Sequence, residues 1–350
     1  MKRTKLTSKE QQVLLGLTNY PGLTDTELSR ILTIKLSTLT AIKRRLQTQQ
    51  YYQSYLVPQL NNLGCELLAV IYTQFNPTIP LEKRIETTKK FIEISDEIIF
   101  SIGEQEKGFS LNLSQNYTNI GRINEIRTQT FGKLGLLDKE YPNEVIFPFD
   151  TSNIIRFLDL KRILSHVFGQ IIPEHRHPVK PWFQKTSARS LTDKQKKVFI
   201  TLVEHPNDTT QQIGQKVGLS RHTVSRMKKE FIEEGILRQL IVPNMKKIGF
   251  ELLTMYHIKF TPHRVPTPHE LETLDTPSTI FFASKSFEAI LISIYPTYQE
   301  YKDDEMQKIR YLKEHDLIAI PPFISTYSFE RMVIIKELDF LPITKKTLQI

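Results

Sequence analysis

Gly218-Leu-Ser-Arg-His-Thr-Val224 is the stretch of sequence that decides the fold. It follows a short helical pattern with Ile213 and Val217 on its apolar side, and it opens a second helical pattern that runs to Glu233. Glycine accepts the left-handed backbone of a tight turn, and Ser220 is a preferred N-cap residue. A short helix, a glycine turn and a capped helix are typical of a helix-turn-helix.

The flanking sequence extends this pattern to a winged helix-turn-helix. Thr192 is placed to cap a preceding helix whose apolar stripe is Val198, Phe199 and Leu202. The range 235–243 reads as a turn followed by a strand, which supplies the wing.

The third helix carries a basic face free of acids. With Val224, Met227 and Phe231 inward, residues 220–229 offer four basic side chains to solvent. Guanidinium groups bind guanine edges and phosphates, and hydroxyls form adaptable hydrogen bonds. The predicted DNA-contacting residues of this helix are Ser220, Arg221, His222, Thr223, Ser225, Arg226, Lys228 and Lys229.

The same pattern occurs earlier in the chain, because the sequence is an internal duplication. At one constant offset, Leu6-Thr7 matches Leu191-Thr192, Val57-Pro58 matches Val242-Pro243, and Glu66-Leu67-Leu68 matches Glu251-Leu252-Leu253. The corresponding DNA-contacting residues are Ser37, Thr38, Thr40, Lys43, Arg44 and Arg45. Thr33 replaces Gly218 and Leu36 lies where a polar group is expected, so we expect this first unit to bind more weakly or less specifically.

Each helix-turn-helix is followed by an expected β-α-β-β-α-β order. In the first repeat the elements are expected at 67–75, 81–94, 98–102, 109–113, 120–137 and 145–149. In the second repeat they are expected at 252–260, 269–274, 280–283, 289–294, 298–315 and 318–323. This order predicts a ferredoxin-like antiparallel sheet with both helices on one face. The fold class is therefore α+β, a tandem duplication of a winged helix-turn-helix plus a ferredoxin-like domain.

Five segments are predicted on this basis. They are winged helix-turn-helix 1 (1–62), ferredoxin-like domain 1 (63–168), a proline-rich basic linker (169–189), winged helix-turn-helix 2 (190–246) and ferredoxin-like domain 2 (247–350). The linker contains Pro173, Pro178 and Pro181, which oppose regular helix. Its basic side chains are expected to add phosphate contacts.

Each half resembles the Lrp/AsnC (feast/famine) family of transcription regulators. The resemblance rests on Leu191-Thr-Asp-Lys, Gly218 to Val224, Glu234-Gly-Ile-Leu and Lys247-Ile-Gly249. It implies paired sheets, DNA reading by the third helix, and a small-molecule effector at the ferredoxin-like domains. Since one chain holds two units, we expect a pseudo-dimer within the chain, with a homodimer of whole chains as a further level.

The loops between the second and third strands depart from the family's Gly-x-x-Asp pattern. Gly103-Glu-Gln-Glu-Lys-Gly108 lacks the aspartate, and Ser284-Lys-Ser-Phe-Glu288 lacks both residues. The resemblance therefore does not name an amino acid as the effector.

Composition narrows the alternatives. The 350 residues carry a net charge of +9, which favours a polyanionic partner. Cys65 is the single cysteine, so a multi-cysteine metal site is excluded, and it reads as a packed apolar residue, as do Phe281 and Phe282. The spacing of His175 and His177 is poor for a metal, so no metal or cofactor is expected. No apolar run is long enough to span a membrane, and we expect a soluble, cytoplasmic protein.

The sequence favours a sequence-specific double-stranded DNA-binding transcription regulator over two alternatives. Siroheme decarboxylases resemble Lrp-type proteins, but such an enzyme needs basic and imidazole groups beside the sheet. The expected strands of the first repeat contain no His or Arg, and those of the second contain His257. An interaction scaffold without DNA contact is the other alternative, and the retained basic helix faces argue against it. No catalytic residue is predicted.

Overall fold

The computed structural model describes residues 6–138, 140–170, 182–184 and 189–350, and it confirms both helix-turn-helix units. The elements of the first unit are α1 (Ser8–Asn19), α2 (Asp25–Ile31), α3 (Leu36–Thr48) and β1 (Tyr52–Pro58). Those of the second unit are α7 (Asp193–Glu204), α8 (Thr210–Val217), α9 (Arg221–Glu233) and β7 (Leu237–Pro243). Strands β1 and β7 pair with each other as a two-stranded sheet.

Threonine capping boxes begin the first two helices of both units. Thr7 and Thr192 cap α1 and α7, and Thr24 and Thr209 cap α2 and α8, each with a Glu or Gln three residues on that bonds back. Each such cap stabilises a helix by about 1 kcal/mol. Because the cap residues are local in sequence, the sequence alone specifies where these helices begin.

The ferredoxin-like order is also confirmed in both repeats. In the first repeat the elements are β2 (Leu67–Gln74), α4 (Leu81–Glu93), β3 (Ile98–Gly103), β4 (Lys107–Ser114), α5 (Tyr117–Lys133) and β5 (Asn143–Pro148). In the second repeat they are β8 (Leu252–Lys259), α11 (Pro268–Leu274), β9 (Thr279–Lys285), β10 (Glu288–Tyr295), α12 (Tyr298–Glu314) and β11 (Phe323–Ser328). Two short connecting helices, η1 (Leu60–Asn62) and α10 (Met245–Ile248), lead into the sheets.

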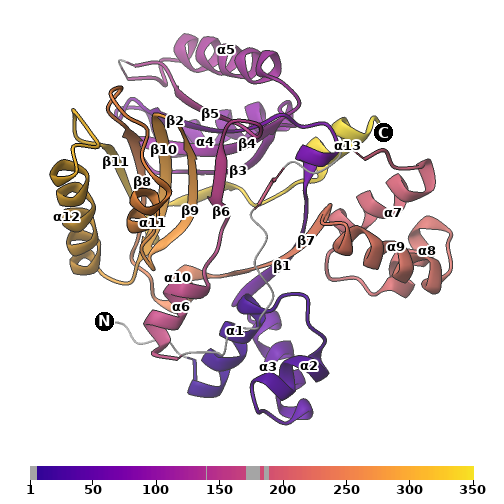
Figure 1. The fold of residues 1–350 in the computed structure, drawn as a ribbon. Coiled ribbons are helices and arrows are strands. Elements are labelled where there is room, and N and C mark those ends of the chain that lie inside the picture. The colour runs from indigo at the N-terminus through magenta and orange to yellow at the C-terminus, as the bar shows by residue number, and fades with distance from the viewer. Residues whose placement is uncertain (1–5, 139, 171–181, 185–188) are drawn as a thin grey trace. The chain divides into compact units, whose positions relative to one another are not determined.

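Each sheet packs its helices on one face (Figure 1). In the second repeat Tyr256, Phe282 and Leu291 of the strands meet Leu274 of α11 and Leu312 of α12. In the first repeat Phe75 and Ile98 meet Phe91 of α4, and Ile123 and Phe131 of α5. Phe281 and Phe282 are fully buried and Cys65 is buried, as predicted. Burial raises the pKa of the Cys65 thiol to about 12.

A fifth strand, unforeseen from the sequence, completes each sheet, and it comes from the other repeat. After β5 the chain continues into β6 (Asn153–Arg156) and α6 (Lys161–Phe168), and β6 lies beside β9 of the second repeat. After β11 it continues into β12 (Val333–Lys336) and α13 (Leu341–Leu348), and β12 pairs antiparallel with β3 of the first repeat. An edge strand leaves backbone N–H and C=O groups unpaired, and the added strand covers that edge.

The structure divides into two compact units, and each combines segments from both repeats. One unit comprises Met1–Leu56, Ile154–Trp182 and Gln239–Glu330, and the other comprises Val57–Asn153, Phe183–Arg238 and Arg331–Ile350. Each unit joins one helix-turn-helix to the sheet of the opposite repeat. The segment β6–α6 belongs to the first repeat in sequence but lies with the sheet of the second repeat. The segment β12–α13 belongs to the second repeat in sequence but lies with the sheet of the first.

The last strand of the second repeat was predicted at 318–323 and is observed at Phe323–Ser328. Ile318 is buried because it packs against the helix-covered core, not because it is in a strand. Pro321 and Pro322 lack the N–H groups that a ladder requires, so pairing begins after them. Most of the predicted linker lies outside the described residues, including His175 and His177.

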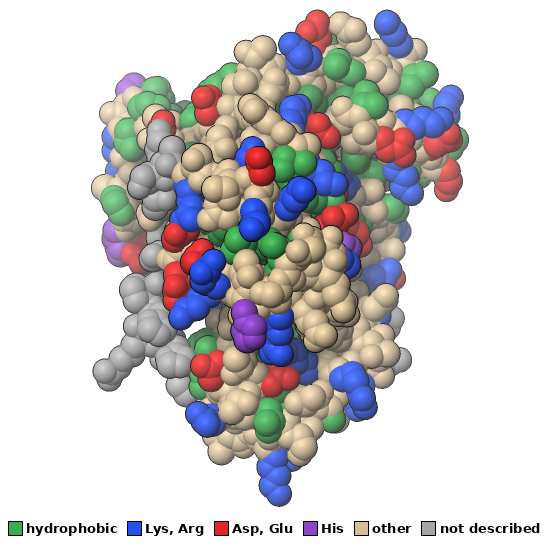
Figure 2. All heavy atoms as spheres, turned by 90° about the vertical axis from the view of Figure 1, so that its right-hand side faces the viewer, with side chains coloured by type: hydrophobic (Ala, Val, Ile, Leu, Met, Phe, Trp, Pro, Cys, Tyr) green, Lys and Arg blue, Asp and Glu red, His purple; other side chains and the backbone are tan. Residues whose placement is uncertain are grey.

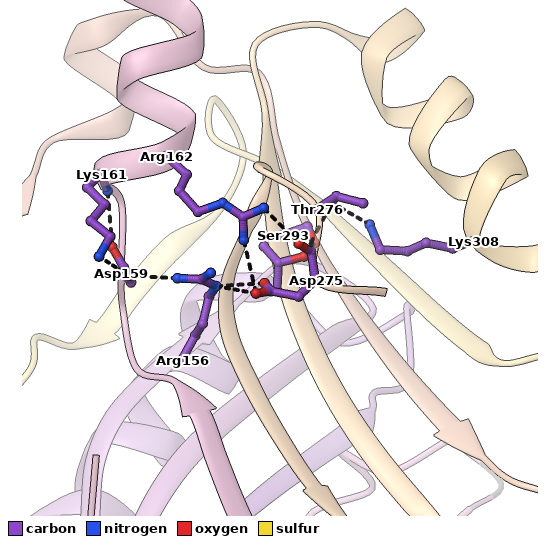
Figure 3. Close-up of polar contacts among 9 residues, drawn as sticks. Arg156, Asp159, Lys161, Arg162, Asp275, Thr276, Ser293 and Lys308 are labelled. Atoms are coloured by element: carbon purple, nitrogen blue, oxygen red, sulfur yellow. Dashed lines mark hydrogen bonds and ion pairs between the residues drawn. The ribbon is translucent and has the colours of Figure 1, made fainter. Parts of the chain in front are cut away.

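A buried aspartate ties the exchanged segment 154–168 to the sheet of the second repeat (Figure 3). Asp275 accepts hydrogen bonds from Arg156 Nε at 2.6 and 2.8 Å, and from Arg162 at 2.9 Å to both its carboxylate and its backbone oxygen. Arg156 also bonds Asp159 at 2.8 Å. Two guanidinium groups thus share the Asp275 carboxylate, with Asp159 as a second partner of Arg156, where the chain passes from one repeat to the other.

We expect Asp275→Asn to lower the free energy of unfolding of its unit by about 2–3 kcal/mol, because Arg156 and Arg162 lose their shared counter-ion while partly buried. Urea unfolding monitored by circular dichroism measures this difference. The control is Asp208→Asn, which breaks a more exposed pair with Lys216 and is expected to cost less than about 1 kcal/mol. Equal losses in the two variants would contradict the role given to Asp275.

Candidate nucleic-acid interface

The turn that leads into α9 requires two glycines. Gly218 has φ of 71°, in the left-handed region that favours glycine. At Gly214 an added Cβ would lie 2.6 Å from the carbonyl oxygen of Leu219, so only glycine fits where the turn folds back on α8. Ser220 then caps α9 by accepting a hydrogen bond from the Thr223 N–H at 3.2 Å. These local features fix where the basic helix begins.

The predicted inward and outward faces of α9 are both observed. Val224, Met227 and Phe231 are buried, and Phe231 packs edge-on against Phe199 of α7 at 5.3 Å between ring centroids. Thr223 and Lys228 are half-buried, and burial lowers the pKa of the Lys228 ammonium. The fully exposed members of the predicted set are Ser220, Arg221, His222, Ser225, Arg226 and Lys229.

Acids near α9 engage its bases only weakly. Arg226 lies 3.7 Å from Glu230 and Lys229 lies 3.6 Å from Glu233, in exposed i,i+4 pairs. Such pairs contribute a few tenths of a kcal/mol and yield readily to a stronger anion. Figure 2 shows one face of the molecule on which Lys and Arg side chains are interspersed with acidic ones. Local ion pairs therefore decide which cations can bind an external anion.

The basic side chains of α3 are held more firmly. Lys43 bonds Asp25 of α2 at 2.6 Å, and Arg45 pairs with Glu10, a carboxylate of α1 that is only 2% exposed. Arg44, Ser37 and Thr40 are exposed, and Thr38 is half-buried. Of the predicted cations in this helix, only Arg44 thus projects into solvent without an ion pair to a described residue.

The first unit also differs at the positions that would read bases. Aligned on the repeat, Leu36 and Ala41 stand where α9 has Arg221 and Arg226. Leu36 is 45% exposed, and its N-cap neighbour Lys35 makes no side-chain cap bond. Thr33, the counterpart of Gly218, is forced to φ of 54°, an unfavourable conformation for a β-branched residue. These features agree with the expectation that the first unit is the poorer reader.

The part of the linker that is described contributes no free cation to this interface. Arg189 forms an ion pair with Glu234, the residue that ends α9, and its backbone N–H bonds the carbonyl of Asn62 at 3.0 Å. Arg189 therefore holds chain in place beside the second helix-turn-helix. The other linker bases named as phosphate contacts fall outside the described residues.

A second polar cluster lies at one end of the second repeat's sheet. Nε2 of His257 on β8 lies 2.6 Å from Oε1 of Glu288 on β10, and Lys285 Nζ lies 2.7 Å from the other oxygen of Glu288. Burial alone would raise the pKa of Glu288, but its hydrogen bonds with His257 and Lys285, and their charges, outweigh burial and lower it to about 2. His257 is the one buried histidine among the described residues.

Sequence analysis missed the buried cations of the ferredoxin-like domains because it looked for them on strands. Arg84 of α4, Arg127 of α5 and Lys308 of α12 are all nearly fully buried on helices. Arg127 occupies the apolar stripe formed by Ile120, Ile123 and Phe131. A cation inside such a stripe is the signal that could have found it.

Within the described ranges, no group of three or more His, Cys, Asp and Glu side chains could hold a metal ion. The same residues include no helix that is long and apolar enough to cross a membrane.

Comparison with known proteins gives a match over the whole chain. The siroheme decarboxylase NirDL superposes with a TM-score of 0.52 over 97% of this chain and 98% of its own length, at 10% identity. The same enzyme with an iron-uroporphyrin III analogue gives 0.51, over 98% and 99%. An AsnC family transcriptional regulator from Agrobacterium tumefaciens matches 39% of this chain and 89% of its own, with a TM-score of 0.30 and 17% identity. No family model matches, and no curated protein matches in sequence. The chain thus has the duplicated helix-turn-helix and ferredoxin-like fold of NirDL.

The pKa of Glu288 predicts a pH-dependent contribution to stability. A carboxyl group whose folded pKa lies below its ordinary value of about 4.3 stabilises the fold above that value, and the contribution is lost as the pH falls toward 2. We expect Glu288→Gln to be less stable than the parent by about 2–3 kcal/mol at pH 7, with the difference shrinking between pH 4 and pH 2. Urea unfolding across that range measures it. In the control, Glu272→Gln on the exposed side of α11, stability at pH 7 should not change. A difference for Glu288→Gln that persists undiminished at low pH would contradict the assignment.

Proposed function

We propose that this protein binds double-stranded DNA through α9 and acts as a transcription regulator. The observation that carries the proposal is the exposed N-terminal half of α9, where Arg221, His222 and Arg226 project into solvent and pair with no buried acid of the described residues. In helix-turn-helix proteins this part of the third helix contacts base edges in the major groove. The arginines would bind guanine, and Lys229 would bind phosphate.

The first helix-turn-helix has a secondary role in this proposal. With Leu36 and Ala41 at the base-reading positions and two of its bases paired, α3 offers Arg44 and the hydroxyls of Ser37 and Thr40 to the phosphate backbone. Phosphate contacts position a protein without reading sequence. The target site is therefore expected to be asymmetric, with its sequence information on the side that α9 contacts.

The double variant Arg221→Ala with Arg226→Ala is expected to weaken binding to a selected duplex by about 30-fold or more, because each bidentate contact to guanine contributes about 1–3 kcal/mol. Fluorescence anisotropy with a duplex from in vitro selection measures the dissociation constant. Lys194→Ala, which removes an exposed cation of α7, is the matched control and should change affinity little.

A salt titration separates the two helices. Arg44→Ala should reduce the dependence of affinity on salt concentration by about one ion while leaving sequence preference intact. The proposal fails if the double variant in α9 binds the selected duplex as tightly as the parent, or if no duplex is selected.

A tetrapyrrole decarboxylase is the second candidate, and the fold match to NirDL over the whole chain supports it, whereas the exposed bases of α9 support the regulator. Decarboxylation replaces a carboxylate with a proton, so a proton donor must lie at the reacting carbon. Among the described residues, His257 is the buried imidazole, and it is hydrogen-bonded to Glu288, so it is the first candidate to test for this role. Absorbance titration with iron-uroporphyrin III, and mass spectrometry after incubation with siroheme, test this candidate. Tight tetrapyrrole binding with loss of carbon dioxide, and no duplex binding, would replace the regulator with the enzyme.

A further inference from the structure

A small cavity lies between the sheet and the helices of the first repeat. It measures about 30 Å³ and sits among β2, β3, β4, α4 and α5. Most of its wall is apolar, formed by side chains such as Phe91, Ile98 and Phe109. The polar groups in the wall are four hydroxyl side chains and one cation, namely Thr73, Thr88, Ser101, Ser110 and Arg127.

Arg127 brings a buried positive charge to this cavity. Its side chain is 6% exposed, one of its nitrogens donates to Ser110 Oγ at 3.3 Å, and its guanidinium lies over the Phe91 ring at 5.0 Å. It forms no ion pair with any described residue, and Glu144 acts on it only from beyond contact distance while hydrogen-bonded to Asn124. Burial lowers the pKa of Arg127 to about 10, partly offset by the charge of Glu144. A buried charge without a counter-ion is costly.

The second repeat shows what completes such a site. Helices α5 and α12 align from Tyr117 and Tyr298, which places Lys308 where the first repeat has Arg127. Lys308 is equally buried, but it pairs with Asp304 one turn earlier and bonds Thr276 at 2.8 Å. In α5, Ile123 occupies the position that corresponds to Asp304. The two repeats therefore share a buried cation, and only the second carries its own carboxylate.

We infer that the cavity beside Arg127 binds a small monovalent anion, which takes the place of the missing carboxylate. A guanidinium binds carboxylates and halides, and the Ser and Thr hydroxyls donate further hydrogen bonds to an anion. A cavity needs about 10–15 Å³ of this volume to hold one water molecule, so about 30 Å³ leaves room for a small anion such as chloride or formate. The site is separate from α9 and is independent of the proposed function.

Hydrogen–deuterium exchange of the full chain tests this site. In chloride-free buffer at constant ionic strength, adding sodium formate or sodium chloride in place of sodium gluconate should slow exchange in peptides from residues 107–133. At an anion concentration about twice the dissociation constant, the slowing should be about threefold. Peptides from residues 288–314 are the internal control, because Lys308 already has its carboxylate, and they should not respond. Whether chloride or formate acts at the lower concentration identifies the natural class of anion.

Two variants check that the effect belongs to Arg127. Ile123→Asp supplies an internal carboxylate, as in the second repeat, and should abolish the response to anions. Arg122→Met removes an exposed arginine of the same helix and should leave the response intact. The inference is overturned if exchange of 107–133 is the same in formate, chloride and gluconate, or if Arg122→Met removes the response.

Crystallography keeps the test independent of how the variants fold. A bromide soak of the parent protein should give an anomalous peak beside the Arg127 guanidinium. A fully occupied water there, with no bromide signal, would overturn the inference.

Discussion

The open edges of two short sheets are the constraint on which this structure depends. A four-stranded ferredoxin-like sheet has two edge strands with unpaired N–H and C=O groups, and in these sheets β3 and β9 each form one of the two edges. Each edge is closed by a strand of the opposite repeat, β12 on β3 and β6 beside β9. The closing segment continues into a helix that packs on a helix-turn-helix, α6 on α1 and α13 on α7. In each unit, the strand that covers this edge thus connects the sheet to the helix-turn-helix.

This exchange explains what the sequence could and could not predict. The helix-turn-helix units were predictable because caps, glycines and apolar stripes are local signals, as at Ser220 and Gly218. Strands β6 and β12 were not, because each is only four residues long and one of its sides is exposed. Nothing within four residues specifies that Ile334 pairs with Ile102 far back in the chain. Pairing of that kind depends on which edge remains open, and that is a property of the whole fold.

The candidate interface shows the same division between local and long-range information. The faces of α3 and α9 could be read from helical periodicity, and both were confirmed. The difference in ion pairing between α3 and α9 could not be predicted from helical periodicity, because Glu10 and Asp25, which pair with Arg45 and Lys43, lie on other helices. The sequence indicated a weaker first unit only through Thr33 and Leu36, and not through these ion pairs. Among the described residues, the ion pairs leave α9 with more unpaired basic side chains than α3. A difference in ion pairing likewise separates Arg127 from Lys308 in two otherwise similar ferredoxin-like domains.

The fold itself is compatible with a regulator and with an enzyme, so function depends on which charges are left without partners. The exchanged strand β12 belongs to the same unit as α9 and the Arg127 cavity, so the pairing of β12 with β3 is the feature to test. Opposed residues on antiparallel strands have Cα atoms about 4.5–5.5 Å apart, a distance that a disulfide can bridge. With Cys65→Ala, Ile102→Cys and Ile334→Cys combined, oxidation at low protein concentration is predicted to give a disulfide within one chain, detected by mass spectrometry of the monomer. Reduced cysteines, or disulfides formed only between chains, would contradict the exchange.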